Sequence, residues 1–162
     1  MQLLLILQAL CLLATANGIP VIVKKLLGSW AALPLDAGIK WLDGQRLFGI
    51  SKTVRGIVAS ISITAILAPL LGSSVGLGAL VAIFAMLGDL FSSFVKRRLG
   101  FLPSAQAIGL DQIPESLLPL LVCQKQLGLS FADVAICVGI FFAGELIISR
   151  VLYWLHVRDQ PY

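Results

Sequence analysis

The stretch GIVASISITAILAPLLGSSVGLGALVAIFAMLG, residues 56–88, decides the fold, because it contains no charged side chain. One bilayer-spanning helix needs about 20 apolar residues, so this stretch is long enough for two helices. Pro69 and the sequence LLGSSVG, residues 70–76, are typical of a tight turn between them. The sequence therefore predicts a membrane hairpin here.

The composition extends this interpretation to the whole chain. Of its 162 residues, 59% are hydrophobic and 12% are charged, whereas about a quarter of the residues in a soluble domain are charged. So small a protein could not bury this much apolar surface in a water-soluble core. We therefore expect an all-α integral membrane protein with a single domain, residues 1–162. About five transmembrane helices are expected, at residues 3–23, 54–71, 76–95, 114–127 and 131–155.

Two of these spans leave alternatives open. In the first, Ala14-Thr15-Ala16 resembles a signal-peptidase site, but no basic residue precedes the apolar core. A retained helix is therefore expected, with a cleaved signal as the alternative. In the fourth, only nine uncharged residues separate Glu115 from Lys125. A short, tilted or re-entrant segment is the alternative to a full span there.

The basic residues predict how the chain is oriented in the membrane. Under the five-span arrangement, 11 of the 12 lysines and arginines lie at one face of the bilayer, and Lys125 alone lies at the other. The positive-inside rule assigns the basic face to the cytoplasm. The expected cytoplasmic loops are residues 24–53 and 96–113, with the N-terminus outside. The 11 residues are Lys24, Lys25, Lys40, Arg46, Lys52, Arg55, Lys96, Arg97, Arg98, Arg150 and Arg158.

The loop PLDAGIKWLDGQRLFGISKTVRG, residues 34–56, carries the first group of polar residues. Lys52 and Arg55 flank the predicted start of the second span. A helix N-terminus offers unpaired N–H groups and a partial positive charge, so basic residues beside it favour an anion such as phosphate. The alternative is a set of ordinary basic anchors that reach the headgroups.

A second polar group closes the third span, in GDLFSSFVKRRLG, residues 88–100. Four of its polar residues share one helix face and Arg97 lies close to it, whereas Arg98 is about half a turn away and is expected to anchor at lipid headgroups. An acidic residue in a spanning helix is costly, which favours a functional site facing the protein interior. The alternative is a structural ion pair with another helix. The four residues are Asp89, Ser92, Ser93 and Lys96.

Two further acidic sites lie beyond these motifs. Asp111 precedes Pro114, a residue that suits the first turn of a helix, so Asp111 is either functional or a helix cap. Glu145 lies about 21 Å along the last span, in the cytoplasmic third of a core about 30 Å thick. Glu145 is expected to face the cavity lined by Asp89 and Lys96, or else to pair with a basic side chain of another helix.

Taken in order, DGQRLFGISKTVRG, GDLFSSFVKRR and GLDQ resemble the motifs of the CDP-archaeol synthase family. These are small membrane cytidylyltransferases related to the CDP-diacylglycerol synthases. The motifs match over residues 34–114, and the whole chain matches in length and number of spans. The resemblance implies a five-helix bundle with a polar cavity open to the cytoplasm. It also implies Mg²⁺-dependent transfer of CMP from CTP to a membrane lipid phosphate, which gives a CDP-activated lipid and pyrophosphate.

The resemblance implies roles for individual residues. Asp89, Lys96 and Asp111 would be catalytic, and Asp89 and Asp111 would hold Mg²⁺, which prefers oxygen ligands. The remaining motif residues would bind the substrates, through the CTP phosphates or the lipid phosphate. They are Asp43, Arg46, Lys52, Thr53, Arg55, Ser93, Arg97 and Gln112. The expected partners are CTP, a lipid phosphate and the membrane, with no nucleic acid.

The chain also departs from the archaeal pattern of this family. Val54 stands where those members often have Trp, and Ile-Pro-Glu-Ser follows Gln112 in place of an apolar-acidic-aromatic run. The sequence therefore looks more like bacterial relatives, in an inner membrane with the active site facing the cytoplasm. The identity of the lipid tail stays open. A small-anion transporter and a non-catalytic membrane partner protein are the alternative functions.

Overall fold

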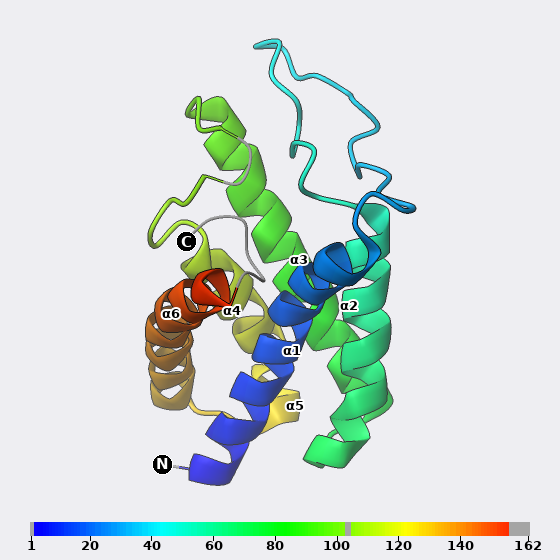
Figure 1. Cartoon of the computed structure of the whole chain (residues 1–162). Helices are drawn as coiled ribbons and strands as arrows, with labels where there is room; N and C mark the ends of the chain where they lie inside the picture. The colour runs from blue at the N-terminus through cyan, green and yellow to red at the C-terminus, as the bar shows by residue number, and fades with distance from the viewer. Residues whose placement is uncertain (1, 103–104, 156–162) are drawn as a thin grey trace.

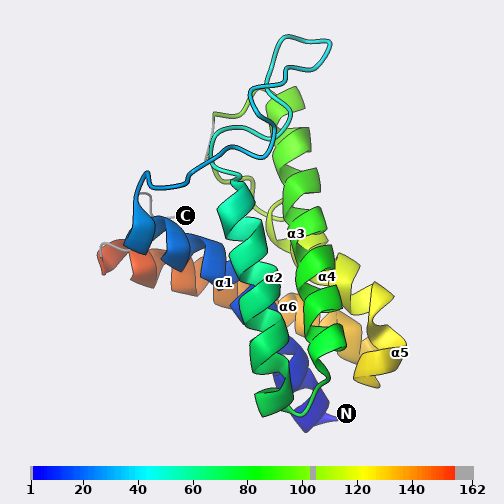
Figure 2. The same cartoon turned by 90° about the vertical axis from the view of Figure 1, so that its right-hand side faces the viewer.

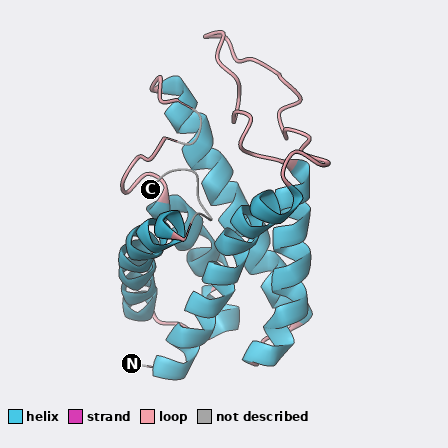
Figure 3. Ribbon diagram, viewed as in Figure 1, coloured by secondary structure: helices cyan, strands magenta, loops and turns pink. Residues whose placement is uncertain are grey.

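The computed structural model describes residues 2–102 and 105–155, and these residues form a bundle of helices joined by loops (Figures 1 and 3). The all-α fold class is confirmed. Two isolated bridges are the only strand-like pairings in the described part of the chain. The elements are α1 (Leu3–Leu27), α2 (Val54–Leu67), the 3₁₀ helix η1 (Ala68–Leu71), α3 (Val75–Arg98), α4 (Gln112–Val122), α5 (Gln124–Leu127) and α6 (Phe131–Trp154).

Four segments in the described part of the chain are long and apolar enough to cross a membrane: α1, α2 with η1, α3 and α6. They coincide with the first, second, third and last predicted spans, although α1 continues to Leu27 and α3 continues to Arg98. Many of their large apolar side chains face outward, such as Leu4 on α1 and Ile147 on α6. Such surfaces suit contact with lipid.

The fourth predicted segment consists of two short helices, whereas the sequence left open a short, tilted or re-entrant segment. α4 contains 11 residues, so it is about 16 Å long, roughly half the thickness of a bilayer core. A break at Cys123 and the left-handed Gly128 limit α5 to a single turn. A fifth complete span therefore stays a prediction.

Small polar side chains define where the helices begin. The Thr53 hydroxyl accepts a hydrogen bond from the backbone N–H of Gly56, and Ser74 caps α3 in the same way. Ser130 and Asp133 form a reciprocal capping box at the start of α6. These caps satisfy backbone N–H groups that a helix leaves unpaired. The starts of α2, α3 and α6 lie within one residue of the predicted starts.

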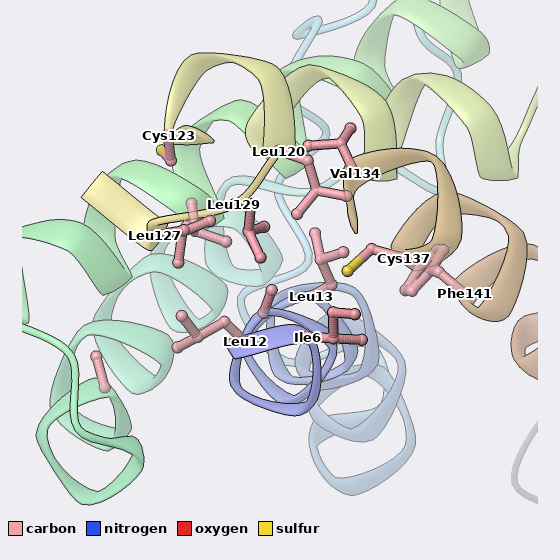
Figure 4. Close-up of a cluster of buried hydrophobic side chains, with 13 residues drawn as sticks. Ile6, Leu12, Leu13, Leu120, Cys123, Leu127, Leu129, Val134, Cys137 and Phe141 are labelled. Carbon is pink, nitrogen blue, oxygen red and sulfur yellow. The ribbon is translucent and has the colours of Figure 1, made fainter. Parts of the chain in front are cut away.

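The helices pack through small residues and an apolar core. α2 and α3 form the predicted hairpin, with η1 at its turn (Figure 2). They approach closely because a Cβ on Gly78 would lie 2.7 Å from the Thr64 carbonyl oxygen. Such contacts are typical of membrane helices. On the other side of α1, side chains of α1, α4 and α6 form the core (Figure 4), including Ile6, Leu12, Leu13, Leu120, Val134, Cys137 and Phe141.

The segments that carry the predicted site residues lie at one end of the bundle. The loop that follows α1 and the C-terminal end of α3 lie at the same end, whereas the N-terminus and the α2–α3 turn lie at the other (Figure 1). This arrangement agrees with the prediction that Lys52 and Lys96 share one side of the membrane. Which compartment that side faces stays a prediction, and Arg158 lies outside the described residues.

Candidate functional site

The first ion pair of the site joins the loop before α2 to the middle of the bundle. The Lys52 ammonium donates to both carboxylate oxygens of Asp89 on α3, each at 2.6 Å. Burial disfavours the charged ammonium, but the adjacent carboxylate outweighs it, so the pKa of Lys52 is raised. Asp89 thus makes the ion pair that the sequence left as an alternative to a functional role. Its role as a metal ligand stays a prediction.

The second ion pair ties the loop after α3 back onto that helix. The Lys96 ammonium lies 2.6 Å from Oδ1 of Asp111 and also donates to the Ala105 carbonyl oxygen. The other Asp111 oxygen accepts from the Ala107 backbone N–H at 2.8 Å. Asp111 is the residue before α4, but its side chain makes no capping hydrogen bond. The capping alternative for Asp111 is therefore not what the structure shows.

A close crossing of α3 and α4 brings the two ion pairs together. A Cβ on Gly88 would lie 2.2 Å from the Pro114 carbonyl oxygen and 2.7 Å from Cα of Glu115, so only glycine fits. The residue after Gly88 is Asp89, and Asp111 lies just before α4. Asp89, Asp111 and Glu115 all act electrostatically on Lys52. Three motifs that lie far apart in the sequence thus converge at one place.

Hydrogen bonds from neighbouring residues fix the geometry of this crossing. The buried Ser92 hydroxyl donates to the carbonyl oxygen of Leu110 and to that of Gly88. The Gln112 side chain accepts from the Gly109 backbone N–H at 2.8 Å, which shapes the GLDQ turn. Gln112 therefore has a structural partner within its own motif, and its predicted substrate contact remains a prediction.

The loop between α1 and α2 is organised around Asp36. The buried Asp36 carboxylate accepts hydrogen bonds from the backbone N–H groups of Gly38, Phe48 and Gly49, and it pairs with Arg46 at 3.1 Å. Burial alone would raise its pKa, but these donors and the Arg46 charge outweigh burial, so the pKa of Asp36 is lowered. Asp36 is not among the site residues expected from the sequence. Its spacing of two residues from a glycine, typical of an Asx turn, was the available signal.

Arg98 fastens the same loop to the end of α3. Its guanidinium pairs with Asp43 at 2.8 Å, donates to the Arg46 carbonyl oxygen and lies 4.9 Å from the centre of the Phe94 ring. Trp41 contacts that ring edge-on. The expectation that Arg98 anchors at lipid headgroups is therefore wrong. The helical spacing within α3 gave no information about the loop between α1 and α2, which packs against the end of this helix.

The remaining predicted substrate residues divide into two groups. Thr53 uses its hydroxyl as the cap of α2, and Arg55 donates to backbone oxygens of the segment after α1, so both have structural partners. Ser93 and Arg97 are buried on α3, where Arg97 donates to the Leu102 carbonyl oxygen. None of these four residues contacts the Lys52–Asp89 pair in a described hydrogen bond.

The carboxylates of the site suit a hard cation. Asp89 already holds a cationic group between its two oxygens, in the form of the Lys52 ammonium. In the described part of the chain, no three His, Cys, Asp or Glu side chains cluster tightly enough to hold a metal ion unaided. Mg²⁺ is usually bound through one or two carboxylates together with substrate phosphates and water. The donor set of Asp89 and Asp111 fits that mode of binding.

Glu145 on α6 lies near the site, and both of its expected roles stay predictions. It lies close enough to Glu115 on α4 to act electrostatically on that carboxyl group. Glu115 is only 6% exposed and interacts electrostatically with Asp89 and Lys52. The sequence predicted that Glu145 would face the cavity or pair with a basic side chain. It did not predict that a second acidic residue, Glu115, would lie nearby.

The geometry can be compared with known proteins. The model of the CarS-like family, described as CDP-archaeol synthase, matches residues 2–162. A CDP-archaeol synthase of Sulfurisphaera tokodaii is 29% identical over 91% of this chain and 89% of its own length. The corresponding protein of Pyrococcus furiosus is 38% identical over 60% of each chain.

A solved structure is also similar. It is described as structural insight into an intramembrane enzyme for archaeal membrane lipids biosynthesis, and it aligns with a TM-score of 0.68 at 28% identity. The alignment covers 85% of this chain and 90% of that one. These relatives are archaeal, so the expectation of a bacterial-type member stays a prediction.

Proposed function

Because the chain belongs to the CarS-like CDP-archaeol synthase family, we propose that it transfers CMP from CTP to a membrane lipid phosphate. A phosphate oxygen of the lipid attacks the α-phosphorus of CTP, the bond to the β-phosphate breaks, and pyrophosphate leaves. The observation that carries the proposal is the convergence of Lys52–Asp89 and Lys96–Asp111 at the crossing of α3 and α4. Two cations and two anions therefore lie together, which suits the binding of a charged substrate.

The two ion pairs suit this reaction because transfer of a phosphoryl-type group depends on positioning and charge neutralisation. Lys52 and Lys96 are neutralised by carboxylates in the ligand-free chain. Phosphate oxygens can replace those carboxylates as partners of the ammonium groups. The lipid phosphate is already an anion, so the nucleophile needs no general base. The reaction therefore requires no histidine or cysteine as base or nucleophile.

Asp89 and Asp111 would hold Mg²⁺ once their lysine partners turn to phosphate oxygens. The bound ion supplies neutralisation of the triphosphate charge. The basic loop residues Arg46, Arg55 and Arg97 would complete the binding surface for the phosphates, with Thr53, Ser93 and Gln112 shaping it. Asp43 would act through Arg98 in holding the loop. The end of the bundle that carries this surface would face the cytoplasm, since CTP is present there and the basic residues gather there.

A labelling experiment with purified protein tests the proposal. The protein in detergent is incubated with Mg²⁺, a panel of lipid phosphates and CTP that carries its label in either the α- or the γ-phosphate. Label from the α-phosphate is expected in the lipid fraction, and label from the γ-phosphate is expected in pyrophosphate. Label from the γ-phosphate in the lipid would contradict transfer of CMP. Flux of a small anion across liposomes with no labelled lipid would instead favour the transporter alternative.

A further inference from the structure

The buried carboxylate of Asp36 lies outside both ion pairs of the site, yet it connects two backbone segments of the loop between α1 and α2. The residue before it, Leu35, donates its backbone N–H to the Lys52 carbonyl oxygen at 2.8 Å. Its own Oδ2 atom accepts the backbone N–H groups of Phe48 and Gly49, at 3.3 and 3.0 Å. Asp36 therefore links the backbone at Lys52 to the backbone at Gly49.

Gly49 lies directly against the side chain of Arg97, at the C-terminal end of α3. A Cβ on Gly49 would lie 3.8 Å from Cδ and 3.9 Å from Nε of Arg97. The φ of Gly49 is +93°, a left-handed conformation that favours glycine. The contact with Arg97 therefore depends on this backbone conformation, which the hydrogen bond to Asp36 holds in place.

Arg97 is a buried cation without a carboxylate partner. Its side chain is only 6% exposed, and no ion pair joins it to a carboxylate in the described part of the chain. One terminal nitrogen donates to the Leu102 carbonyl oxygen at 2.8 Å, whereas Nε has no hydrogen-bond partner among the described residues. A buried charge is costly unless it is paired, and a guanidinium matches the geometry of a phosphate group. Arg97 thus suits an anionic ligand.

We propose that Asp36 is a positioning residue for the triphosphate of CTP, and that it acts through Gly49 to hold the guanidinium of Arg97 in place. Phosphate oxygens then accept hydrogen bonds from Arg97 when CTP binds. Asp36 itself contacts no substrate, because its oxygens accept from backbone N–H groups and pair with Arg46. The identity of the ligand rests on the proposed function, whereas the hold on Arg97 does not.

An arginine reagent tests the hold on Arg97 without any substrate. Phenylglyoxal modifies accessible guanidinium groups, and mass spectrometry of the digested protein gives the rate of modification at Arg97. Asp36→Asn should raise this rate at least about fivefold, because an amide has one acceptor oxygen and would turn an NH₂ group toward backbone N–H donors. Both proteins are measured in detergent at a temperature where they are folded. Equal rates would overturn the proposal.

Two glycines of the same loop provide a matched pair of variants, which also serves if Asp36→Asn does not fold. Gly49 and Gly44 both have a positive φ, of +93° and +76°, so alanine is strained at either position. A Cβ on Gly44 would meet no atom within 4 Å. Gly49→Ala should raise both the modification rate of Arg97 and the KM for CTP, and Gly44→Ala should change neither. Equal effects of the two substitutions would overturn the role of the Gly49 contact.

Steady-state kinetics tests the role in binding CTP. Because Arg97 meets charge that CTP carries before it reacts, Asp36→Asn should raise the KM for CTP about tenfold and change kcat by less than about threefold. In an Arg97→Met background, Asp36→Asn should raise the KM no further, since the group through which it acts is gone. A lower kcat at an unchanged KM would show a purely structural role. A further rise of the KM in the double variant would show that Asp36 does not act through Arg97.

The outcomes separate failure of this proposal from failure of the proposed function. If the wild type transfers no CMP, the proposed function fails, but the modification rate of Arg97 still decides whether Asp36 and Gly49 hold that side chain. If the wild type transfers CMP and Asp36→Asn has the wild-type KM, the proposed function stands and the positioning role of Asp36 is refuted.

Discussion

Gly88→Ala should disable the enzyme without unfolding it. The new methyl group would lie 2.2 Å from the Pro114 carbonyl oxygen, where ordinary contact begins near 3.4 Å. Since both partners are backbone atoms, α4 must withdraw from α3 by about 1 Å to relieve the overlap. Overpacking of this size typically costs about 1–3 kcal/mol of stability. The same displacement carries Asp111 and Glu115 away from Asp89.

The effect on activity should exceed the effect on stability. A misplacement of about 1 Å in a catalytic group can reduce the rate by about 100-fold. We therefore expect Gly88→Ala to lower the rate of lipid labelling from CTP by about two orders of magnitude. Thermal unfolding in detergent should show a folded protein with a modestly reduced midpoint.

Gly139→Ala provides the matched control, because it is the same substitution in α6 and a Cβ there meets no atom within 4 Å. It should leave both rate and midpoint unchanged. Gly88→Ala with wild-type turnover and wild-type stability would refute the idea that this crossing aligns the site. Equal losses of turnover and stability in both variants would show that replacing any helical glycine by alanine has this effect, whether or not the helices cross there.

Three other predictions concern the loop and the orientation. Asp36→Asn should destabilise the protein at neutral pH and reduce the loss of stability on acidification. Because folding lowers the pKa of Asp36, its carboxylate stabilises the folded protein at pH values above the ordinary pKa of 3.8. This stabilisation is lost as the pH falls through the pKa of Asp36 in the folded protein. Unfolding midpoints measured against pH check this, and identical profiles for variant and wild type would contradict it. Arg98→Ala should release the loop between α1 and α2 from α3, which should speed limited proteolysis of the loop and raise the KM for CTP several-fold. An unchanged rate of proteolysis would show that Arg98 does not hold this loop in place. In intact cells, an impermeant thiol reagent should not label a cysteine that replaces the exposed Leu42, but it should label a cysteine that replaces Ser74. The reverse pattern would show that the protein has the opposite orientation in the membrane.

The hairpin and the long helices could be predicted because their signals are local. Residues 56–88 lack charge, and Thr53, Ser74 and Ser130 cap the helices that follow them. The break after α4 was harder to locate, since Pro119 and Cys123 lie in an apolar run that also resembles a span. Hydropathy reports the length of an apolar segment but not where its helix breaks. This segment is close to the minimum length that a helix needs to cross the bilayer.

The members of the site could be predicted, but their pairings could not. Helical spacing placed Asp89 and Lys96 on one face, yet each pairs with a residue of another segment, Lys52 or Asp111. Periodicity within one helix carries no information about which segment packs against it. The same limit explains the wrong expectation for Arg98, whose partner is supplied by a distant loop.

Neutralising the two acids of the site tests the central claim most directly. Asp89→Asn and Asp111→Asn keep the shape of each side chain and remove its charge, and Asp133→Asn makes the same change at the far end of the bundle. With Mg²⁺, CTP labelled in its α-phosphate and a lipid phosphate, the first two variants should remain folded and transfer no detectable label to lipid. Asp133→Asn should retain transfer. Transfer at the wild-type rate by either site variant at limiting Mg²⁺ would contradict the account.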